Sequence, residues 1–128
     1  MTYLLDTHVF LWWVMQSPRL SPKAFALCQD EKNSLKLSIT SVWEIQIKEQ
    51  LGKLRLPARL AEIVETQRDR NRIELLSIEL EHVLRLADLP TYHKDPFDRL
   101  LIAQAQVEGL VLISGDARLA DYPVEVVW

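Results

Sequence analysis

The sequence predicts a single α/β domain, residues 1–128, built as a three-layer α/β/α sandwich around a central, mostly parallel sheet of four to five strands. Short apolar segments such as TYLL and LVLI alternate with longer stretches of helical periodicity along the whole chain. Strands that alternate with helices form parallel sheets covered on both faces, and such strands read as continuous apolar runs. The chain has 128 residues, the length of one domain, and no linker or repeat divides it.

Five strands and six helices are expected, in near alternation. The apolar runs predict strands at Thr2–Asp6, Leu35–Thr40, Ile73–Ile78, Leu110–Ser114 and Val124–Trp128. The helical patterns predict helices at His8–Met15, Pro22–Asp30, Ser41–Leu51, Ala58–Arg70, Leu80–Leu89 and Pro96–Val107. Gly52 and Gly109 follow two of these helices, where glycine commonly ends a helix.

The composition indicates a globular protein of a reducing compartment. The chain is 48% hydrophobic and 26% charged, and its single cysteine, Cys28, permits no internal disulfide. Its longest apolar run, HVFLWWVM, is far shorter than the ~20 residues that span a bilayer, and the first residues lack the basic region of a signal peptide. We therefore expect a cytoplasmic protein with no membrane attachment. The net charge of −3 argues against a generally basic nucleic-acid surface, and only three glycines exclude a glycine-rich phosphate loop.

Acidic residues follow the predicted strands. Asp6 ends the first strand, Glu44 lies one turn past the second, Glu79 follows the third and Asp116 follows the fourth. Asp98 opens the helix that leads into the fourth strand. Ligands bind beyond the carboxyl ends of the strands in open α/β sheets, so we expect these acids to gather at one rim.

Each of these acids could instead serve the backbone alone. Ser41 and Glu44 fit a capping box, in which the glutamate accepts a hydrogen bond from a backbone N–H. Asp95 fits a helix N-cap with Asp98 in the first turn, and Asp116 could cap a short following helix. Local sequence therefore leaves structural and functional roles open for these positions.

Asp6 is harder to explain by helix capping. It follows the buried run YLL, and no lysine or arginine lies within ten residues of it. Desolvating an unpaired carboxylate is costly, so Asp6 needs hydrogen-bond donors, such as Thr7 and backbone amides, or a metal ion. Four carboxylates about 5 Å apart would repel one another by about 3 kcal/mol per pair, so such a pocket must bind cations or hold protons. Oxygen ligands without a histidine or cysteine set favour Mg²⁺ or Mn²⁺.

Three segments resemble a known family. YLLDTHVFLWW, SITSVWEIQIKEQLGKL and HKDPFDRLLIAQAQVEGLVLISGD occur in this order over most of the chain and resemble PIN-domain ribonucleases, most closely the VapC-type toxins of type II toxin–antitoxin pairs. The resemblance implies a PIN-like fold. The catalytic and metal-ligating acids that it implies are Asp6, Glu44, Asp98 and Asp116. The residues expected to support them are Thr7, Asp95, Arg99 and Ser114, the last in place of a threonine that the family often carries.

The resemblance also implies a function and partners. The function is Mg²⁺- or Mn²⁺-dependent hydrolysis of RNA phosphodiester bonds by the toxin of a toxin–antitoxin system, because divalent cations neutralise the phosphate and lower the pKa of bound water. The partners are a cognate antitoxin, whose tail occupies the acidic groove, and a second copy of the chain. Trp12 and Trp13 are adjacent and cannot face the same way on a helix, so either one packs in the core while the other meets a dimer mate or antitoxin, or the helix is buried on most sides. Local basic residues would contact RNA: Lys48, Lys53, Arg55, Arg59, Arg68, Arg70, Arg72, Lys94 and Arg99.

Other classes compete with this interpretation. A catalytically idle or regulatory PIN-like binding module is one alternative, and the presence of all four acids argues against it. A phosphoacceptor receiver domain needs paired acids after the first strand and an aspartate after the third, whereas the chain has Asp6 alone and Glu79. A haloacid-dehalogenase-like phosphatase needs aspartates two positions apart, and His8 occupies the second position. The spacing of His8, His82 and His93 matches no common zinc pattern.

Overall fold

The computed structural model describes residues 1–128 and contains one five-stranded sheet. The strands are β1 (Thr2–Leu5), β2 (Ser34–Ser38), β3 (Glu74–Leu76), β4 (Val111–Ile113) and β5 (Val126–Val127). Every neighbouring pair is parallel, in the order β3-β2-β1-β4-β5. The helices are α1 (Thr7–Val14), α2 (Pro22–Gln29), α3 (Ile39–Gln50), α4 (Leu60–Asn71), α5 (Leu80–Arg85) and α6 (Pro96–Glu108), with 3₁₀ helices η1 (Leu86–Asp88) and η2 (Ala117–Asp121). The predicted α/β class is confirmed.

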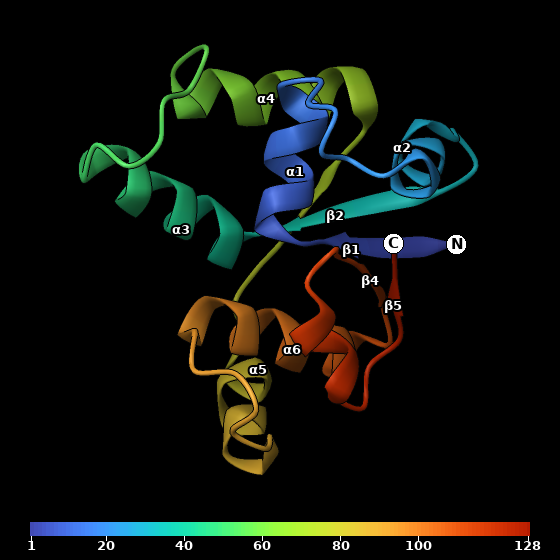
Figure 1. Ribbon diagram of the computed structural model, residues 1–128, viewed down its shortest axis with the longest axis vertical. Helices are drawn as coiled ribbons and strands as arrows, with labels where there is room; N and C mark the ends of the chain where they lie inside the picture. The colour runs from blue at the N-terminus through green and yellow to red at the C-terminus, as the bar shows by residue number, and fades with distance from the viewer.

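Helices cover both faces of the sheet, which gives three layers. Helices α1, α3 and α4 lie on one side and α5 and α6 on the other (Figure 1). Side chains alternate along β1: Tyr3 and Leu5 join an apolar cluster with α1 to α4, whereas Leu4 joins a second cluster with α6 and η2. Burial on both faces explains why the strands read as unbroken apolar runs. None of the helices combines the length and apolar character needed to cross a bilayer.

Most element boundaries agree with prediction, but the start of α3 does not. The helix begins at Ile39, two residues before its predicted start at Ser41, because Ser38 is its N-cap and accepts a hydrogen bond from the Thr40 amide at 2.9 Å. The predicted strand therefore ends at Ser38 and not at Thr40. Gly109 ends α6 in the left-handed region with φ of 66°, as predicted.

The strand order places β1 and β4 side by side at the centre of the sheet. From β1 the chain moves through β2 to the β3 edge, and then returns to pair β4 with the opposite side of β1. The carboxyl ends of β1 and β4 therefore form the switch point where α/β sheets open a crevice. The Asp6 amide donates to the Ile113 carbonyl at 3.0 Å, which joins the residues that follow these two strands.

Candidate active site

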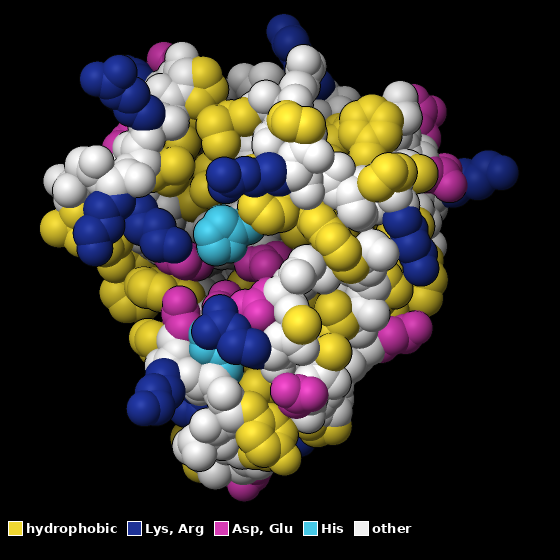
Figure 2. All heavy atoms as spheres, viewed as in Figure 1, with side chains coloured by type: hydrophobic (Ala, Val, Ile, Leu, Met, Phe, Trp, Pro, Cys, Tyr) yellow, Lys and Arg dark blue, Asp and Glu magenta, His cyan; other side chains and the backbone are white.

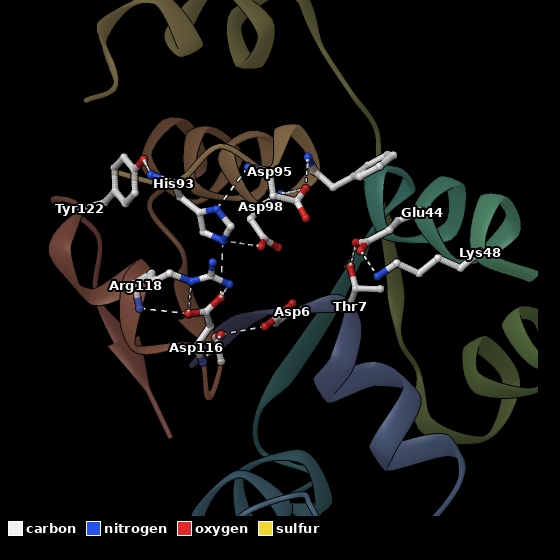
Figure 3. A network of polar contacts seen from close by, with 12 residues as sticks. Asp6, Thr7, Glu44, Lys48, His93, Asp95, Asp98, Asp116, Arg118 and Tyr122 are labelled. Atoms are coloured by element: carbon white, nitrogen blue, oxygen red, sulfur yellow. Dashed lines mark hydrogen bonds and ion pairs between the residues drawn. The ribbon is translucent and has the colours of Figure 1, made fainter. Parts of the chain in front are cut away.

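The predicted acids come from four elements and face one hollow. Asp6 directly follows β1, Asp98 lies in the first turn of α6 and Asp116 is the N-cap of η2. Glu44 projects from α3 at the side of the same space (Figure 3). Figure 2 shows acidic side chains gathered in a hollow near the middle of the molecule, with basic side chains at its rim.

Two of the acids, Glu44 and Asp116, have basic partners, and we call them the outer acids. Glu44 is 2% exposed; its carboxylate lies 2.7 Å from Lys48 Nζ and accepts a 2.7 Å hydrogen bond from Thr7 Oγ1. Asp116 accepts hydrogen bonds from Arg118 Nε at 3.1 Å and Nη2 at 2.9 Å. These side-chain hydrogen bonds hold the pKa of Asp116 below its ordinary value.

Asp6 and Asp98, which we call the inner acids, form no ion pair with lysine or arginine. Asp6 is 4% exposed; Ser114 Oγ donates to its Oδ2 at 2.7 Å, and its Oδ1 is buried without a partner. Burial raises the pKa of Asp6 above its ordinary value even though the Ser114 hydrogen bond opposes the rise. Burial also raises the pKa of Asp98 from 3.8 to about 7, and the carboxylates of Asp6 and Asp95 add to the effect.

Ser114 and Thr7, two of the residues expected to support the acids, form hydrogen bonds with different acids. Ser114 fits its expected place, because it donates to Asp6 and accepts from the Asp116 amide at 3.1 Å. Thr7 supports Glu44 and Ser41, so the expectation that it would be the donor to Asp6 is wrong.

The side chains of Asp95 and Arg99 form hydrogen bonds with backbone groups. Asp95 caps α6, accepting from the amides of Phe97 at 2.8 Å and Asp98 at 3.4 Å. The Arg99 guanidinium donates to the carbonyls of Leu86 and Leu89, both at 3.2 Å, so it braces η1 and makes no hydrogen bond to the acids.

The capping-box explanation of Glu44 is also wrong. Helix α3 begins three residues before the box requires, so Ser41 and Glu44 lie inside the helix and both are buried. Glu79, by contrast, is an exposed residue at the N-cap of α5, away from the four acids, as its sequence position allowed.

Sequence reasoning missed His93. This histidine is 5% exposed, and its Nε2 lies 2.8 Å from Asp98 Oδ2 and 3.5 Å from Asp116 Oδ2. The available signal is its position two residues before the N-cap of α6, whereas the three histidines of the sequence raise only the question of a zinc site. That site does not form, because the Nε2 of His82 pairs instead with Glu108 at 3.0 Å.

The donor set suits a hard divalent cation. The inner acids are carboxylates without a lysine or arginine partner, and Asp6 Oδ1 is an orphaned buried oxygen. Ligand atoms of His93, Asp98 and Asp116 all lie within 4.8 Å of one another. Oxygen-rich sites of this kind prefer Mg²⁺ or Mn²⁺ to softer metals.

A large cavity lies elsewhere, on the α1–α4 side of the molecule. It has a volume of about 1000 Å³, and Trp12, Trp13, Phe25 and Ile63 are among the residues that line it. Trp12 packs on Trp128 and Trp13 on Phe25, with ring centroids 5.8 and 5.6 Å apart, and both tryptophans are partly buried against the same apolar cluster. Cavity size does not locate the chemistry here, because this groove holds none of the four acids.

Comparisons with known proteins agree with this architecture. VapBC2 from Rickettsia felis, solved bound to a DNA fragment from its promoter, has a chain that superposes with a TM-score of 0.73 at 16% identity, covering 99% of this chain and 98% of that one. DNA-bound VapBC from Salmonella typhimurium gives 0.69 at 17%, with 99% and 97% coverage. A toxin–antitoxin complex from Klebsiella pneumoniae gives 0.63 at 19%, with 98% and 96% coverage. No curated protein sequence matched. The PIN domain model matches residues 3–125, so the chain belongs to the PIN domain family.

Proposed function

We propose that this PIN domain is a divalent metal-dependent endoribonuclease that hydrolyses RNA phosphodiester bonds with Mg²⁺ or Mn²⁺ as its cofactor. PIN domains are nucleases. What we propose beyond this is that the substrate is RNA and that the metal is Mg²⁺ or Mn²⁺. The observation that supports it is the pair of inner acids: Asp6 is 4% exposed, the Asp98 side chain is 14% exposed, and neither forms an ion pair with lysine or arginine. A cation is the partner that would allow both carboxylates to ionise near neutral pH.

The residues of the site divide into metal holders and phosphate contacts. Asp6, Glu44, Asp98 and Asp116 would hold the metal directly or through water. When bound, the divalent ion would supply positive charge to the attacked phosphate and lower the pKa of a water molecule. Lys48 and Arg118 stand beside the two outer acids, where they can neutralise RNA phosphates on either side of the cut.

An aromatic pair at the site supports a single-stranded substrate. Trp43 is 53% exposed and packs edge-on against Phe97, with ring centroids 5.1 Å apart and an interplanar angle of 77°. Trp43 directly precedes Glu44 on α3, and Phe97 directly precedes Asp98 on α6, so the contact between the two rings joins the helices that carry these carboxylates. Exposed aromatic rings stack on unpaired bases of any sequence. We therefore expect the RNA to be cut in a loop or another unpaired segment.

The test is cleavage of structured RNAs by the purified protein with Mg²⁺, Mn²⁺ or EDTA. Cleavage should require the metal and should be abolished by Asp6→Asn or Asp98→Asn. Glu79→Gln is the matched control, because it removes an exposed acid that also follows a strand. Full cleavage by Asp98→Asn would end the assignment. Metal binding without cleavage would favour an idle binding module, and phosphorylation by acetyl phosphate would favour a receiver-like domain.

We also propose that the chain acts as the toxin of a toxin–antitoxin pair and that it forms a homodimer. The similar structures include VapBC and a toxin–antitoxin complex, which supports an antitoxin partner. Exposed apolar side chains on α5, Leu80 at 71% and Leu84 at 62%, support self-association. Co-expression with the protein encoded by the adjacent reading frame should silence cleavage, and light scattering of the isolated chain should give twice the monomer mass.

A further inference from the structure

His93 is a buried histidine at the inner acids to which the proposed chemistry assigns no role. It precedes α6, and its backbone N–H donates to Tyr122 Oη at 2.9 Å, which ties this loop to the end of η2. Its ring points at the carboxylates of Asp98 and Asp116 (Figure 3). A ring in this position can act in two ways: as a metal ligand through a lone pair on Nε2, or as a hydrogen-bond donor through a proton on Nε2.

The other ring nitrogen decides between these two roles. The backbone N–H of Asp95 donates to His93 Nδ1 at 3.1 Å. A backbone amide can only donate, so Nδ1 is the acceptor and the proton of the neutral ring is on Nε2. A histidine that ligates a metal shows the reverse arrangement, because its second nitrogen donates to a carboxylate or carbonyl. The Asp95 amide thus gives His93 the tautomer of a donor.

The same arrangement occurs a second time in the fold. The Glu79 amide donates to Nδ1 of the fully buried His82 at 2.9 Å, and Nε2 of His82 pairs with Glu108 Oε2 at 3.0 Å. His82 is remote from the four acids and simply ties the start of α5 to the end of α6. Both histidines therefore accept a backbone N–H at Nδ1 and have Nε2 close to a carboxylate, which for His93 is Asp98 at 2.8 Å.

We propose that His93 is a positioning residue whose Nε2–H fixes the carboxylates of Asp98 and Asp116 relative to each other, and that it does not ligate the metal. Asp98 accepts from no other side chain, whereas Asp116 is also held by Arg118. Nε2 of His93 lies 2.8 Å from Asp98 Oδ2 and 3.5 Å from Asp116 Oδ2 and makes no regular hydrogen bond with any other group, so these two carboxylates are the acceptors within reach of its N–H. The inference rests on one part of the proposed function, namely that these acids bind a divalent ion.

The tautomer can be measured without any RNA or cleavage assay. Long-range ¹H–¹⁵N correlation spectra of the wild-type protein, recorded at about pH 8 where histidine is ordinarily neutral, should show a protonated Nε2 and an unprotonated Nδ1 for His93. Saturating Mg²⁺ should leave this pattern in place. A proton on Nδ1, or loss of the Nε2 proton when Mg²⁺ is added, would overturn the proposal.

Mn²⁺ titrations of variants test the positioning role. His93→Ala should weaken Mn²⁺ binding about 10- to 100-fold, the usual effect of losing a residue that orients a ligand. His93→Gln should restore most of that affinity, because its amide NH₂ can donate from the place of Nε2. The control His82→Ala removes the equivalent buried histidine away from the acids, so it should lower stability and leave Mn²⁺ affinity unchanged.

Direct coordination has a separate signature. Electron spin echo spectra of the Mn²⁺-loaded wild-type protein should show no directly bound nitrogen, and a bound nitrogen lost in His93→Gln would overturn the proposal. An equal loss of Mn²⁺ affinity in His93→Gln and His93→Ala would also overturn the proposal. If the wild-type protein bound no divalent ion, the proposed function would fail, and with it the metal-positioning role; the spectra of the ring would then still report whether His93 is a donor.

Discussion

Replacing Asp98 by asparagine should stabilise the fold above neutral pH and change it much less in acid. Burial, reinforced by neighbouring carboxylates, raises the pKa of Asp98 from 3.8 to about 7. Between these two pH values the folded protein keeps a proton that the unfolded chain has released. The free energy of unfolding therefore falls as the pH rises through this range, and the loss is complete above about pH 7.

The size of the effect follows from the two pKa values. Each tenfold difference in proton affinity corresponds to about 1.4 kcal/mol, so the ionised carboxylate lowers the free energy of unfolding by at most about 4 kcal/mol. The Asp98 side chain is 14% exposed, and contact with solvent reduces the expected value to about 2–3 kcal/mol. Asparagine has the same shape and no charge, so Asp98→Asn should recover this amount, or about 10 °C in Tm for a domain of this length.

Thermal unfolding followed by circular dichroism in EDTA measures this gain. It should be full at about pH 8 and about one third as large at about pH 5, because most of the loss develops above that pH. Saturating Mn²⁺ should raise the Tm of the wild-type protein and have little effect on the variant. Asp69→Asn, which removes an exposed carboxylate on α4, is the control and should change neither value. An Asp98→Asn variant no more stable than wild type at pH 8 would refute the electrostatic reasoning.

Four further outcomes follow from the structure. Ser114→Ala removes the 2.7 Å hydrogen bond to Asp6. Calorimetry should therefore show a free energy of unfolding lower by about 1–3 kcal/mol at pH 8, together with weaker Mn²⁺ binding. Ser114→Thr keeps the hydroxyl and should be close to wild type in both. Gln104→Ala leaves Ser38 Oγ and the Ser77 carbonyl without their hydrogen-bond partner. Denaturant unfolding should therefore show a free energy of unfolding lower by about 2–4 kcal/mol. The control Gln106→Ala, at a more exposed position, should lower it by under about 1 kcal/mol. Trp43→Ala should weaken binding of unpaired RNA by about 1–3 kcal/mol in fluorescence anisotropy, whereas Trp43→Phe should keep most of the affinity. Burial raises the pKa of the Cys28 thiol to about 11, so this thiol should react with a disulfide reagent at neutral pH only after unfolding; rapid reaction of the native protein would contradict the buried position.

Local sequence patterns were sufficient for the layers and for the acids at the rim. Alternating apolar runs and helical stretches gave the three layers, because strand and helix periodicity are properties of neighbouring residues. The positions after β1 and β4 were predictable as well, since parallel strands end at one edge of the sheet. Asp95 followed by Pro96 gave the start of α6 correctly, whereas Ser41 and Glu44 were wrongly assigned to a helix start that Ser38 in fact caps.

The pairing of the acids was beyond any local pattern. Ser114, 108 residues along the chain from Asp6, became its hydrogen-bond donor because β4 pairs with β1. Thr7, the immediate neighbour of Asp6, donates its hydroxyl hydrogen bond to Glu44 on α3 instead. Hydrogen-bond geometry depends on atoms that approach within about 3 Å, and sequence spacing does not specify such approaches between separate elements.

The sequence by itself determined which residues could form an acidic site in this protein: one carboxylate after each of two central strands and one on each of two helices. Only the tertiary structure decided that Glu44 and Asp116 pair with lysine and arginine while Asp6 and Asp98 do not, and that His93 lies against Asp98 and Asp116. The physical reason is that charge pairing and desolvation depend on the distances and burial that arise when distant segments pack together.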